Sequence, residues 1–297
     1  MDEMRPIVVG TDGSATSQPA LDVAADEAAR SGAPLRIVHA FIVSQAYAAP
    51  EVILEAGTLD YLRAEAERVL SEAAAYVTER HPGLTVSTAL ATSPPAPALR
   101  SESESASLIV LGSRGLGGFK GLLLGSVTVQ VAAHAACPVL VVPSGAGDAD
   151  QARDPRLTGP VIVGVDGSDA SGRAVERAFD RAQDLDTDLI AVHGWTDPVS
   201  TGPYDPLPTV YDVEVIEQEE SRLFDEALDG WDERYPEVSV HRRFVRDHPA
   251  KAILAQAVEG SVVVVGSRGR GGFKGLLLGS VSQSVLQHAT CPVEIVR

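Results

Sequence analysis

Short apolar runs alternate with longer amphipathic segments along the chain. In the first half, apolar residues recur at steps of three and four between positions 59 and 77, as on one face of an α-helix. Two of the short runs, 108–112 and 139–142, are apolar at nearly every position, which is typical of strands covered on both faces of a parallel sheet. We therefore expect helices that alternate with strands at 7–10, 35–40, 85–90, 108–112 and 139–142.

The second half of the chain repeats the first half at a constant offset. Cys137 and Cys291 lie 154 residues apart, and each is followed by proline. The longest match joins 112–126 to 266–280, and these two segments differ at a single position. The chain therefore contains two copies of one domain in tandem.

Each copy has the alternation of a doubly wound α/β domain. Right-handed crossovers would give about five mostly parallel strands with helices on both faces. In such sheets, ligands bind beyond the carboxyl ends of the strands, where the strand order reverses. We place the copies at 1–146 and 158–297, and the stretch 147–157, which contains Gly, Asp and Pro, is the expected linker.

A glycine-rich loop follows the fourth expected strand of each copy. In the first copy it reads Gly-x-x-Gly from Gly112 to Gly115, then nine residues, then Gly125-Ser126. Glycines allow close approach of a ligand to the backbone, and successive N–H groups in such a loop bind anions. We expect Ser126 to cap the next helix, whose N-terminus favours phosphate. On this interpretation the loop is a phosphate site and not merely a flexible turn. The same spacing recurs at Gly266, Gly269, Gly279 and Ser280.

The sequence of this loop does not match two better-known phosphate-binding patterns. A Walker A loop ends in Gly-Lys-Ser/Thr, whereas Lys120 is followed by Gly121. A dinucleotide fingerprint needs glycine three positions after Gly117, where Lys120 stands. The sequence also lacks the residue spacings of common metal sites and the Gly-x-Ser-x-Gly of hydrolases.

Asp12 and Asp166 follow the first strand of each copy. A carboxylate beside phosphates is favourable if it holds a divalent cation such as Mg²⁺ or accepts ribose hydroxyl groups. The alternative is an Asx turn, because Asp is common in segments such as Thr-Asp-Gly-Ser. Both interpretations stay open, and Mg²⁺ at Asp12 and Asp166 belongs to the first.

The second strand of each copy ends in histidine and a small residue, His39-Ala40 and His193-Gly194. We interpret the histidines as structural. Ala40 and Gly194 leave backbone groups open to the edge of a purine ring.

Charge and composition narrow the choice of partners. The 297 residues include 41 Asp and Glu against 24 Lys and Arg, a formal net charge of −17. Such a surface repels phosphate backbones and anionic lipid, so we expect neither nucleic-acid binding nor membrane insertion. With two cysteines and no leader-like segment, the chain is expected in the cytoplasm, its thiols buried as small apolar groups.

At these motifs the chain resembles the universal stress protein family, in particular its tandem two-domain members of actinobacteria. ATP-binding members of that family have the same Gly-x-x-Gly, nine residues and Gly-Ser, together with an Asp after the first strand. The resemblance covers nearly the whole chain apart from the linker. It implies two Rossmann-like domains, similar to the adenine nucleotide alpha hydrolases, each with a five-stranded mostly parallel sheet.

The resemblance also implies one ATP site per copy, with phosphates on the glycine loop, ribose near the Asp and adenine against the backbone after the second strand. The implied contacts of the first copy are Gly10, Thr11, Asp12, Ser14, Ala40, Gly112, Arg114, Gly115, Gly125, Ser126 and Val127. Those of the second are Gly164, Val165, Asp166, Ser168, Gly194, Gly266, Arg268, Gly269, Gly279, Ser280 and Val281. In the second loop, Arg270 replaces Leu116 as an extra cation, so we expect the two sites to differ in affinity.

The leading hypothesis is an ATP-binding regulatory module of the stress response, in which nucleotide occupancy changes the protein's shape or its protein partners. The alternative is a slow ATPase or phosphotransferase at the same sites, although no distinct general base stands out. Family members usually dimerise through the last strand. We expect 138–142 and 292–296 to pair within one chain, and whole chains to form a homodimer as well.

Overall fold

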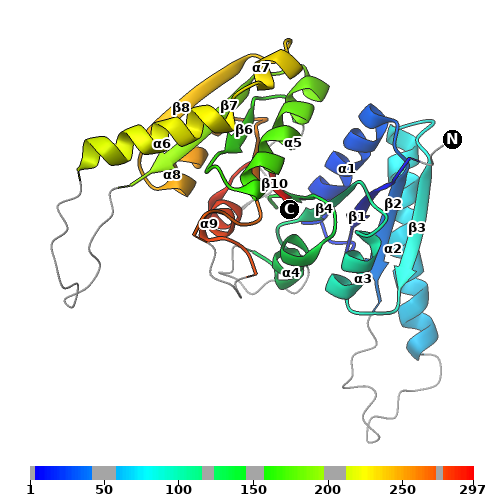
Figure 1. Ribbon diagram of the computed structural model, residues 1–297. Helices are drawn as coiled ribbons and strands as arrows, with labels where there is room; N and C mark the ends of the chain where they lie inside the picture. The colour runs from blue at the N-terminus through cyan, green and yellow to red at the C-terminus, as the bar shows by residue number, and fades with distance from the viewer. Residues whose placement is uncertain (1–3, 42–57, 116–123, 145–156, 197–211, 272–276) are drawn as a thin grey trace, which may run out of the picture. The chain divides into compact units, whose positions relative to one another are not determined.

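A computed structural model describes residues 4–41, 58–115, 124–144, 157–196, 212–271 and 277–297 (Figure 1). The chain divides into two compact units. The first comprises Met1–Leu157 and Ala289–Ile295, and the second comprises Thr158–His288 and Val296–Arg297. The division therefore follows the two copies except at the last strand.

The first unit is an α/β domain whose strands lie in the order β3-β2-β1-β4-β5-β10. Strands β1 to β5 are parallel, and β10 is antiparallel to β5, with Val293 opposite Val141. The strands are β1 (Ile7–Gly10), β2 (Leu35–Ala40), β3 (Val86–Ala91), β4 (Leu108–Gly112), β5 (Val139–Val142) and β10 (Val293–Val296). The helices are α1 (Gln18–Ser31), α2 (Thr58–Arg80), α3 (Pro95–Glu102) and α4 (Ser126–His134).

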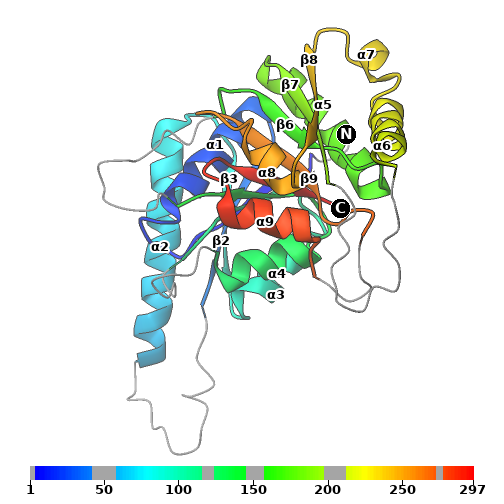
Figure 2. The same ribbon diagram turned by 90° about the vertical axis from the view of Figure 1, so that its left-hand side faces the viewer.

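Two pairs of helices cover the sheet of the first unit. Helix α1 packs on β1 and β4 and contacts α2, which packs on β2 and β3. Helix α3 packs beside α4, as Figure 2 also shows. This arrangement has the two helical layers of a doubly wound fold, which cover both faces of the sheet.

Local sequence explains the bounds of α1. Pro19 lies in its first turn, where a missing N–H costs nothing, and Gly32 ends it with the left-handed φ of 70°. Its inner face buries Leu21, Ala24 and Ala28. These residues recur at steps of three and four, so they form the one apolar face that packs on the sheet.

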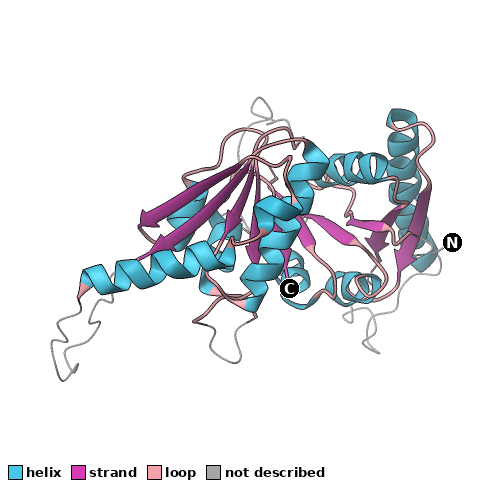
Figure 3. Ribbon diagram, turned by 45° about the horizontal axis from the view of Figure 1, so that its top comes forward, coloured by secondary structure: helices cyan, strands magenta, loops and turns pink. Residues whose placement is uncertain are grey.

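The second unit repeats the design with strand order β9-β6-β7-β8, in which β6 pairs with β7 and β9, and β7 pairs with β8, all parallel. The strands are β6 (Val161–Gly164), β7 (Leu189–Trp195), β8 (Val240–Arg246) and β9 (Val262–Gly266). The helices are α5 (Asp169–Leu185), α6 (Val213–Ala227), α7 (Trp231–Arg234), α8 (Pro249–Leu254) and α9 (Ser280–His288). Figure 3 shows helices on both sides of these strands.

Aromatic side chains fill the second unit where the first has aliphatic ones. Phe179 of α5 is fully buried and stacks on Trp231 and Tyr235, with ring centroids 5.2 and 5.1 Å apart. At the constant offset, Trp231 corresponds to Val77, which is also fully buried. The corresponding position thus carries a small aliphatic side chain in the first copy and a large aromatic one in the second.

The predicted elements agree closely with the structure. The strands expected at 7–10, 35–40, 108–112 and 139–142 have those bounds, and helix α2 contains the expected 59–77 segment. Strand β3 begins and ends one residue later than predicted, and the Thr85 carbonyl accepts from the Leu35 backbone N just before the strand starts. Among the described residues, no helix has the length and apolar character needed to cross a membrane.

Candidate functional site

The candidate site of the first unit lies where the strand order reverses, between β1 and β4. These strands are parallel and in register, with Val9 opposite Val110, so their carboxyl ends lie side by side. In the second unit, β6 and β9 meet in the same way, with Val163 opposite Val264. The topology thus brings the Asp turn and the glycine loop together in each copy, at the ligand-binding edge of such sheets.

The aspartate and the second glycine of the motif are in contact. A Cβ placed on Gly115 would overlap Oδ2 of Asp12, and a Cβ on Gly269 would overlap Oδ2 of Asp166. Neither glycine has a left-handed φ, so it is the close approach, and not φ, that requires them. The structure therefore joins two motifs that are about 100 residues apart in sequence.

An Asx turn holds each of these carboxylates. Oδ1 of Asp12 accepts from the Ser14 backbone N at 3.0 Å and from Ser14 Oγ at 2.5 Å. Oδ1 of Asp166 accepts from Ser168 in the same way, at 3.0 and 2.7 Å. The turn uses Oδ1 and leaves Oδ2 directed at the loop, so the Asx turn and a ligand contact are compatible rather than exclusive.

The first glycine of each motif has a packing role. A Cβ on Gly266 would lie 2.9 Å from the carbonyl of Ala170, and one on Gly112 would lie 3.2 Å from the carbonyl of Thr16. These contacts bring the end of β4 against the segment just before α1, and the end of β9 against the first turn of α5. Close packing alone accounts for glycine at these two positions.

The helix after the loop begins differently from the prediction. The N-cap of α4 is Gly125, without a side-chain cap, and Ser126 is the first helical residue, so its expected capping role is wrong. Gly125 takes this place because its backbone N donates to the Ser113 carbonyl at 2.8 Å. The first N–H groups of α4 have no partner within the helix, which makes its N-terminus favourable for an anion.

A hydroxyl group that the sequence analysis did not identify closes the loop. Thr128 Oγ1 donates to the Gly112 carbonyl at 2.9 Å, and Ser282 Oγ donates to the Gly266 carbonyl at 2.6 Å. Both hydroxyls lie in the first turn of the helix that follows. Their recurrence at the constant offset was a signal in the sequence, but nothing there indicated a partner.

The remaining predicted residues flank this centre. Gly10 and Gly164 end β1 and β6, and the next residues, Thr11 and Val165, bond through their backbone N to the neighbouring strand. Val127 and Val281 lie in the first turn of α4 and α9. The middle of each loop, at 116–123 and 272–276, lies outside the described residues.

The two arginines of the loops differ. Arg114 donates from its guanidinium to the Ser144 carbonyl at 2.9 Å and from its backbone N to Ser144 Oγ at 3.2 Å. It therefore ties the loop to the segment after β5. Arg268, its counterpart, is exposed.

The histidines support the Asp turns, as their structural interpretation requires. Nδ1 of His39 lies 2.8 Å from the Thr11 carbonyl, and Nδ1 of His193 lies 2.8 Å from the Val165 carbonyl. A carbonyl only accepts, so Nδ1 carries a proton in both rings. Each histidine thus fixes the residue before the aspartate from the neighbouring strand.

The small residues after these histidines differ in their surroundings. Ala40 is half-buried at the end of β2. A Cβ on Gly194 would lie 2.7 Å from the Pro249 Cα, so Gly194 is required by the close passage of α8. The segments that follow, 42–57 and 197–211, lie outside the described residues.

Arg270 makes an ion pair in the second unit. Its guanidinium donates to Glu220 of α6 at 2.5 Å, and its backbone N donates to Asp166 Oδ2 at 3.1 Å. Nε2 of His193 lies 2.8 Å from the same Glu220 oxygen. Partial burial raises the pKa of Glu220, but the bonds from Arg270 and His193 outweigh it and hold that pKa below its ordinary value. The extra cation predicted here is therefore engaged by a carboxylate.

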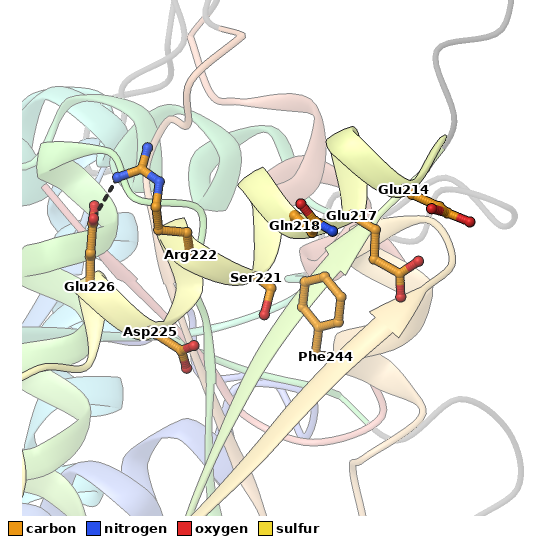
Figure 4. A pocket seen from close by; sticks show the side chains of 8 residues that line it. All are labelled: Glu214, Glu217, Gln218, Ser221, Arg222, Asp225, Glu226 and Phe244. Atoms are coloured by element: carbon orange, nitrogen blue, oxygen red, sulfur yellow. Dashed lines mark hydrogen bonds and ion pairs between the residues drawn. The ribbon is translucent and has the colours of Figure 1, made fainter. Parts of the chain in front are cut away.

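A groove on the second unit is lined by residues outside these motifs (Figure 4). It has a volume of about 660 Å³ between α6 and β8, and Phe244 lies against the helix residues that form its wall. Its lining residues are Glu214, Glu217, Gln218, Ser221, Arg222, Asp225, Glu226 and Phe244. Five of the eight are acidic or amide side chains on the wall, which disfavours a phosphate there, and none is a predicted contact residue.

Among the described residues, no group of three or more His, Cys, Asp and Glu side chains has the arrangement of a metal site. The single carboxylate of Asp12 or Asp166 suits Mg²⁺ only in company with ligand phosphates and water. That is the usual way in which proteins hold this cation.

Comparison with known proteins gives a consistent result. The sequence model of the universal stress protein family matches residues 3–143 and 158–297. A universal stress protein of Mycolicibacterium smegmatis is 41% identical over 297 residues, with 98% of this chain and 96% of the relative covered. Universal stress protein Rv2623 of Mycobacterium tuberculosis is 37% identical over 295 residues, with the same coverage of each chain.

A solved structure that covers nearly the whole chain agrees at the level of the fold. The crystal structure of a universal stress protein from Archaeoglobus fulgidus matches with a TM-score of 0.66 and 24% identity, covering 99% of this chain and 96% of that one. A universal stress protein in complex with cAMP is 30% identical and matches 48% of this chain and all of its own, with a TM-score of 0.38. The first match shows the tandem α/β architecture over the whole length.

Proposed function

Because the chain belongs to the universal stress protein family, we propose that it is an ATP-binding regulatory protein of the stress response, with one nucleotide site in each copy. We place the copies at 1–146 and 158–297, joined by the linker 147–157. The contact between an aspartate and a motif glycine supports this proposal most strongly, because it occurs in both copies at the reversal of strand order.

The arrangement around this contact suits a nucleoside triphosphate. The N–H groups at the start of α4 and of the glycine loop would receive the phosphates, since both favour negative charge. Oδ2 of Asp12 lies between the loop and the end of β1, where it would accept a ribose hydroxyl or hold Mg²⁺ together with phosphate oxygens. Ala40 ends the adjacent strand and would offer its backbone to the adenine.

The second copy offers the corresponding groups. They are Asp166 at the end of β6, Gly269 in the loop, the start of α9 and Gly194 at the end of β7. We expect ATP to act as a regulatory ligand, because the histidines closest to each aspartate already donate to backbone carbonyls. A ring held in this way orients the turn rather than abstracting a proton from a substrate.

Membership of the family supports assembly as a homodimer, and the two free, buried cysteines support a reducing, cytoplasmic setting. Sedimentation of the purified chain would test the assembly, since a monomer at micromolar concentration would contradict it.

The first experiment is to purify the protein without added nucleotide, denature it, and quantify what is released per chain. About two ATP per chain would support two tight sites. ADP or AMP would favour the slow ATPase. If nothing is released, titration with ATP and Mg²⁺ decides, and no binding at millimolar ATP would overturn the proposed function.

A further inference from the structure

One residue of the second glycine loop is tied both to the candidate ligand carboxylate and to a helix. Arg270 donates from its backbone N to Asp166 Oδ2 at 3.1 Å. Its guanidinium donates to Oε2 of Glu220, on α6, at 2.5 Å. The Arg270 guanidinium is therefore directed to an internal anion, while the Arg270 backbone contacts the candidate site.

Glu220 is held in place from a second direction. His193 Nε2 lies 2.8 Å from Glu220 Oε2, and His193 Nδ1 faces the Val165 carbonyl at 2.8 Å. The imidazole is fully buried and stacks on Phe224 and Phe244, with centroids 5.6 and 5.7 Å away. Both ring nitrogens of His193 are thus engaged, Nδ1 by a carbonyl and Nε2 by a Glu220 oxygen. This packing gives Glu220 a fixed position opposite the loop.

The first copy lacks the parts needed for such a pair. At the constant offset, Ala66 stands where Glu220 is and Leu116 stands where Arg270 is. His39 keeps the bond from Nδ1 to the Thr11 carbonyl. The aspartate, the histidine and the glycines are thus common to both copies, whereas the charged pair is an addition to the second.

The ion pair between Arg270 and Glu220 is exposed enough for Arg270 to change partners. The side chain of Arg270 is 41% exposed and that of Glu220 is 22% exposed, so water screens their attraction. A polyphosphate offers a guanidinium several anionic oxygens and more charge than one carboxylate. Phosphates bound at the adjacent loop would therefore compete well for Arg270.

From this geometry, and given the ATP sites proposed above, we propose that Glu220 is an internal competitor for Arg270 in the second copy. It holds the guanidinium in the ligand-free protein, and the phosphates of ATP take its place. The exchange lowers the ATP affinity of the second site below the value it would have without Glu220, and it releases the loop from α6. Nucleotide binding to the second copy is thereby linked to the contact between the loop and this helix.

The two tryptophans of the chain make the second copy observable by itself. Both Trp195 and Trp231 belong to the second copy, and Trp195 follows Gly194 at the end of β7. Tryptophan fluorescence would follow ligand binding to the second copy, while titration calorimetry reports both copies. The ligands are ATP with Mg²⁺ and, as a probe without phosphate, adenosine.

Glu220→Ala installs the residue that the first copy has, and Glu220→Gln removes only the charge. We expect either change to tighten ATP binding to the second copy roughly threefold to tenfold, the range for loss of a partly exposed ionic competitor. Adenosine affinity should not change. In an Arg270→Leu background, Glu220→Ala should not change the ATP affinity of the second copy, because the guanidinium for which Glu220 and ATP compete is absent.

Glu219→Ala is the matched control, since it removes the same charge one residue away, where the carboxylate pairs with Arg222 on the solvent side of α6. Unchanged ATP affinity in both Glu220 variants, or an equal gain in Glu219→Ala or for adenosine, would overturn the competition while leaving ATP binding intact. If the wild-type protein binds no ATP in either copy, the proposed function fails and this inference fails with it. Circular dichroism would show that each variant is folded.

Discussion

Gly269 is in contact with Asp166, so that any side chain at position 269 would displace the carboxylate that closes the end of β6. The same relationship joins Gly115 to Asp12. In both copies, Oδ1 of the aspartate is already fixed by a serine, and the contact leaves Oδ2 no room to move toward the loop. The loop and the turn therefore behave as one unit of structure.

Gly269→Ala is predicted to weaken ATP binding to the second copy by about tenfold or more, a loss of about 1.4 kcal/mol or greater. The added methyl group forces Asp166 to rotate or the loop to retreat, and either movement separates the groups that would hold ribose and phosphate. Tryptophan fluorescence titration with ATP and Mg²⁺ measures the effect.

Gly271→Ala is the control for this change, because position 271 lies in the same loop and a Cβ there meets nothing within 4 Å. It should leave ATP affinity within about twofold of the wild type. An equal loss in both variants would show that general loop flexibility, and not the contact with Asp166, determines binding.

The meeting of these two residues was predictable from the sequence, whereas the network around Arg270 was not. Apolar runs fixed the positions of β1 and β4, and parallel pairing then places their carboxyl ends together. The ion pair between Arg270 and Glu220 joins residues from two elements, and it depends on the rotation of α6 about its axis. Tertiary packing, here of Phe224 on His193, determines this rotation. A local sequence pattern does not predict such packing.

The cap of α4 shows a second limit of the sequence pattern. Ser126 follows a glycine and precedes an apolar segment, which is a common signature of an N-cap. A backbone bond from Gly125 to Ser113 nevertheless starts the helix one residue earlier. A helix start that depends on a backbone bond to another segment is therefore not visible in the local sequence. The start of α5 is visible there, because the side chain of Ser168 caps the helix.

Ser168→Ala is predicted to lower the free energy of unfolding of the second copy by about 1 kcal/mol. Ser168 is the N-cap of α5, and its Oγ accepts from the Ser171 backbone N at 3.2 Å while it donates to Asp166 at 2.7 Å. Alanine removes the cap of α5 and also the hydrogen bond that holds the Asp166 carboxylate. Urea unfolding followed by tryptophan fluorescence measures the change.

Ser14→Ala provides the internal comparison for the cap. Ser14 also donates to an aspartate, but the N-cap of α1 is Ser17, so no cap is lost. We expect a smaller loss of stability, about 0.5 kcal/mol or less, measured by circular dichroism in urea. Equal losses for the two serines would mean that the bond to the aspartate, and not the cap, supplies the stability.

The Glu220 carboxylate should stabilise the second copy in a pH-dependent way. Bonds from Arg270 and His193 outweigh the effect of burial and lower its pKa in the folded state. The stabilisation is therefore complete above the unfolded pKa of about 4.3, and it is lost as the pH falls through the lower folded pKa. The difference in unfolding free energy between wild type and Glu220→Gln should be constant from pH 5 to 6 and shrink toward zero below pH 4. A difference that grows on acidification would contradict this assignment.

Cys137 is predicted to be unreactive in the native protein at neutral pH. Burial raises the pKa of its thiol to about 11, and its side chain is 7% exposed. A Cys291→Ala variant, in which Cys137 is the remaining cysteine, should therefore react with an aromatic disulfide reagent at pH 8 only after unfolding in urea.

The same shift makes stability fall at alkaline pH, because the folded state keeps the thiol proton while the unfolded chain releases it. In this variant the loss begins near the unfolded pKa of about 8.5 and levels off above pH 11. Comparison with the Cys137→Ala, Cys291→Ala double variant isolates the contribution of the thiol, since alanine cannot ionise. Rapid labelling of native Cys137 at pH 8, or identical alkaline profiles of the two variants, would show that the thiol ionises as freely in the folded as in the unfolded chain.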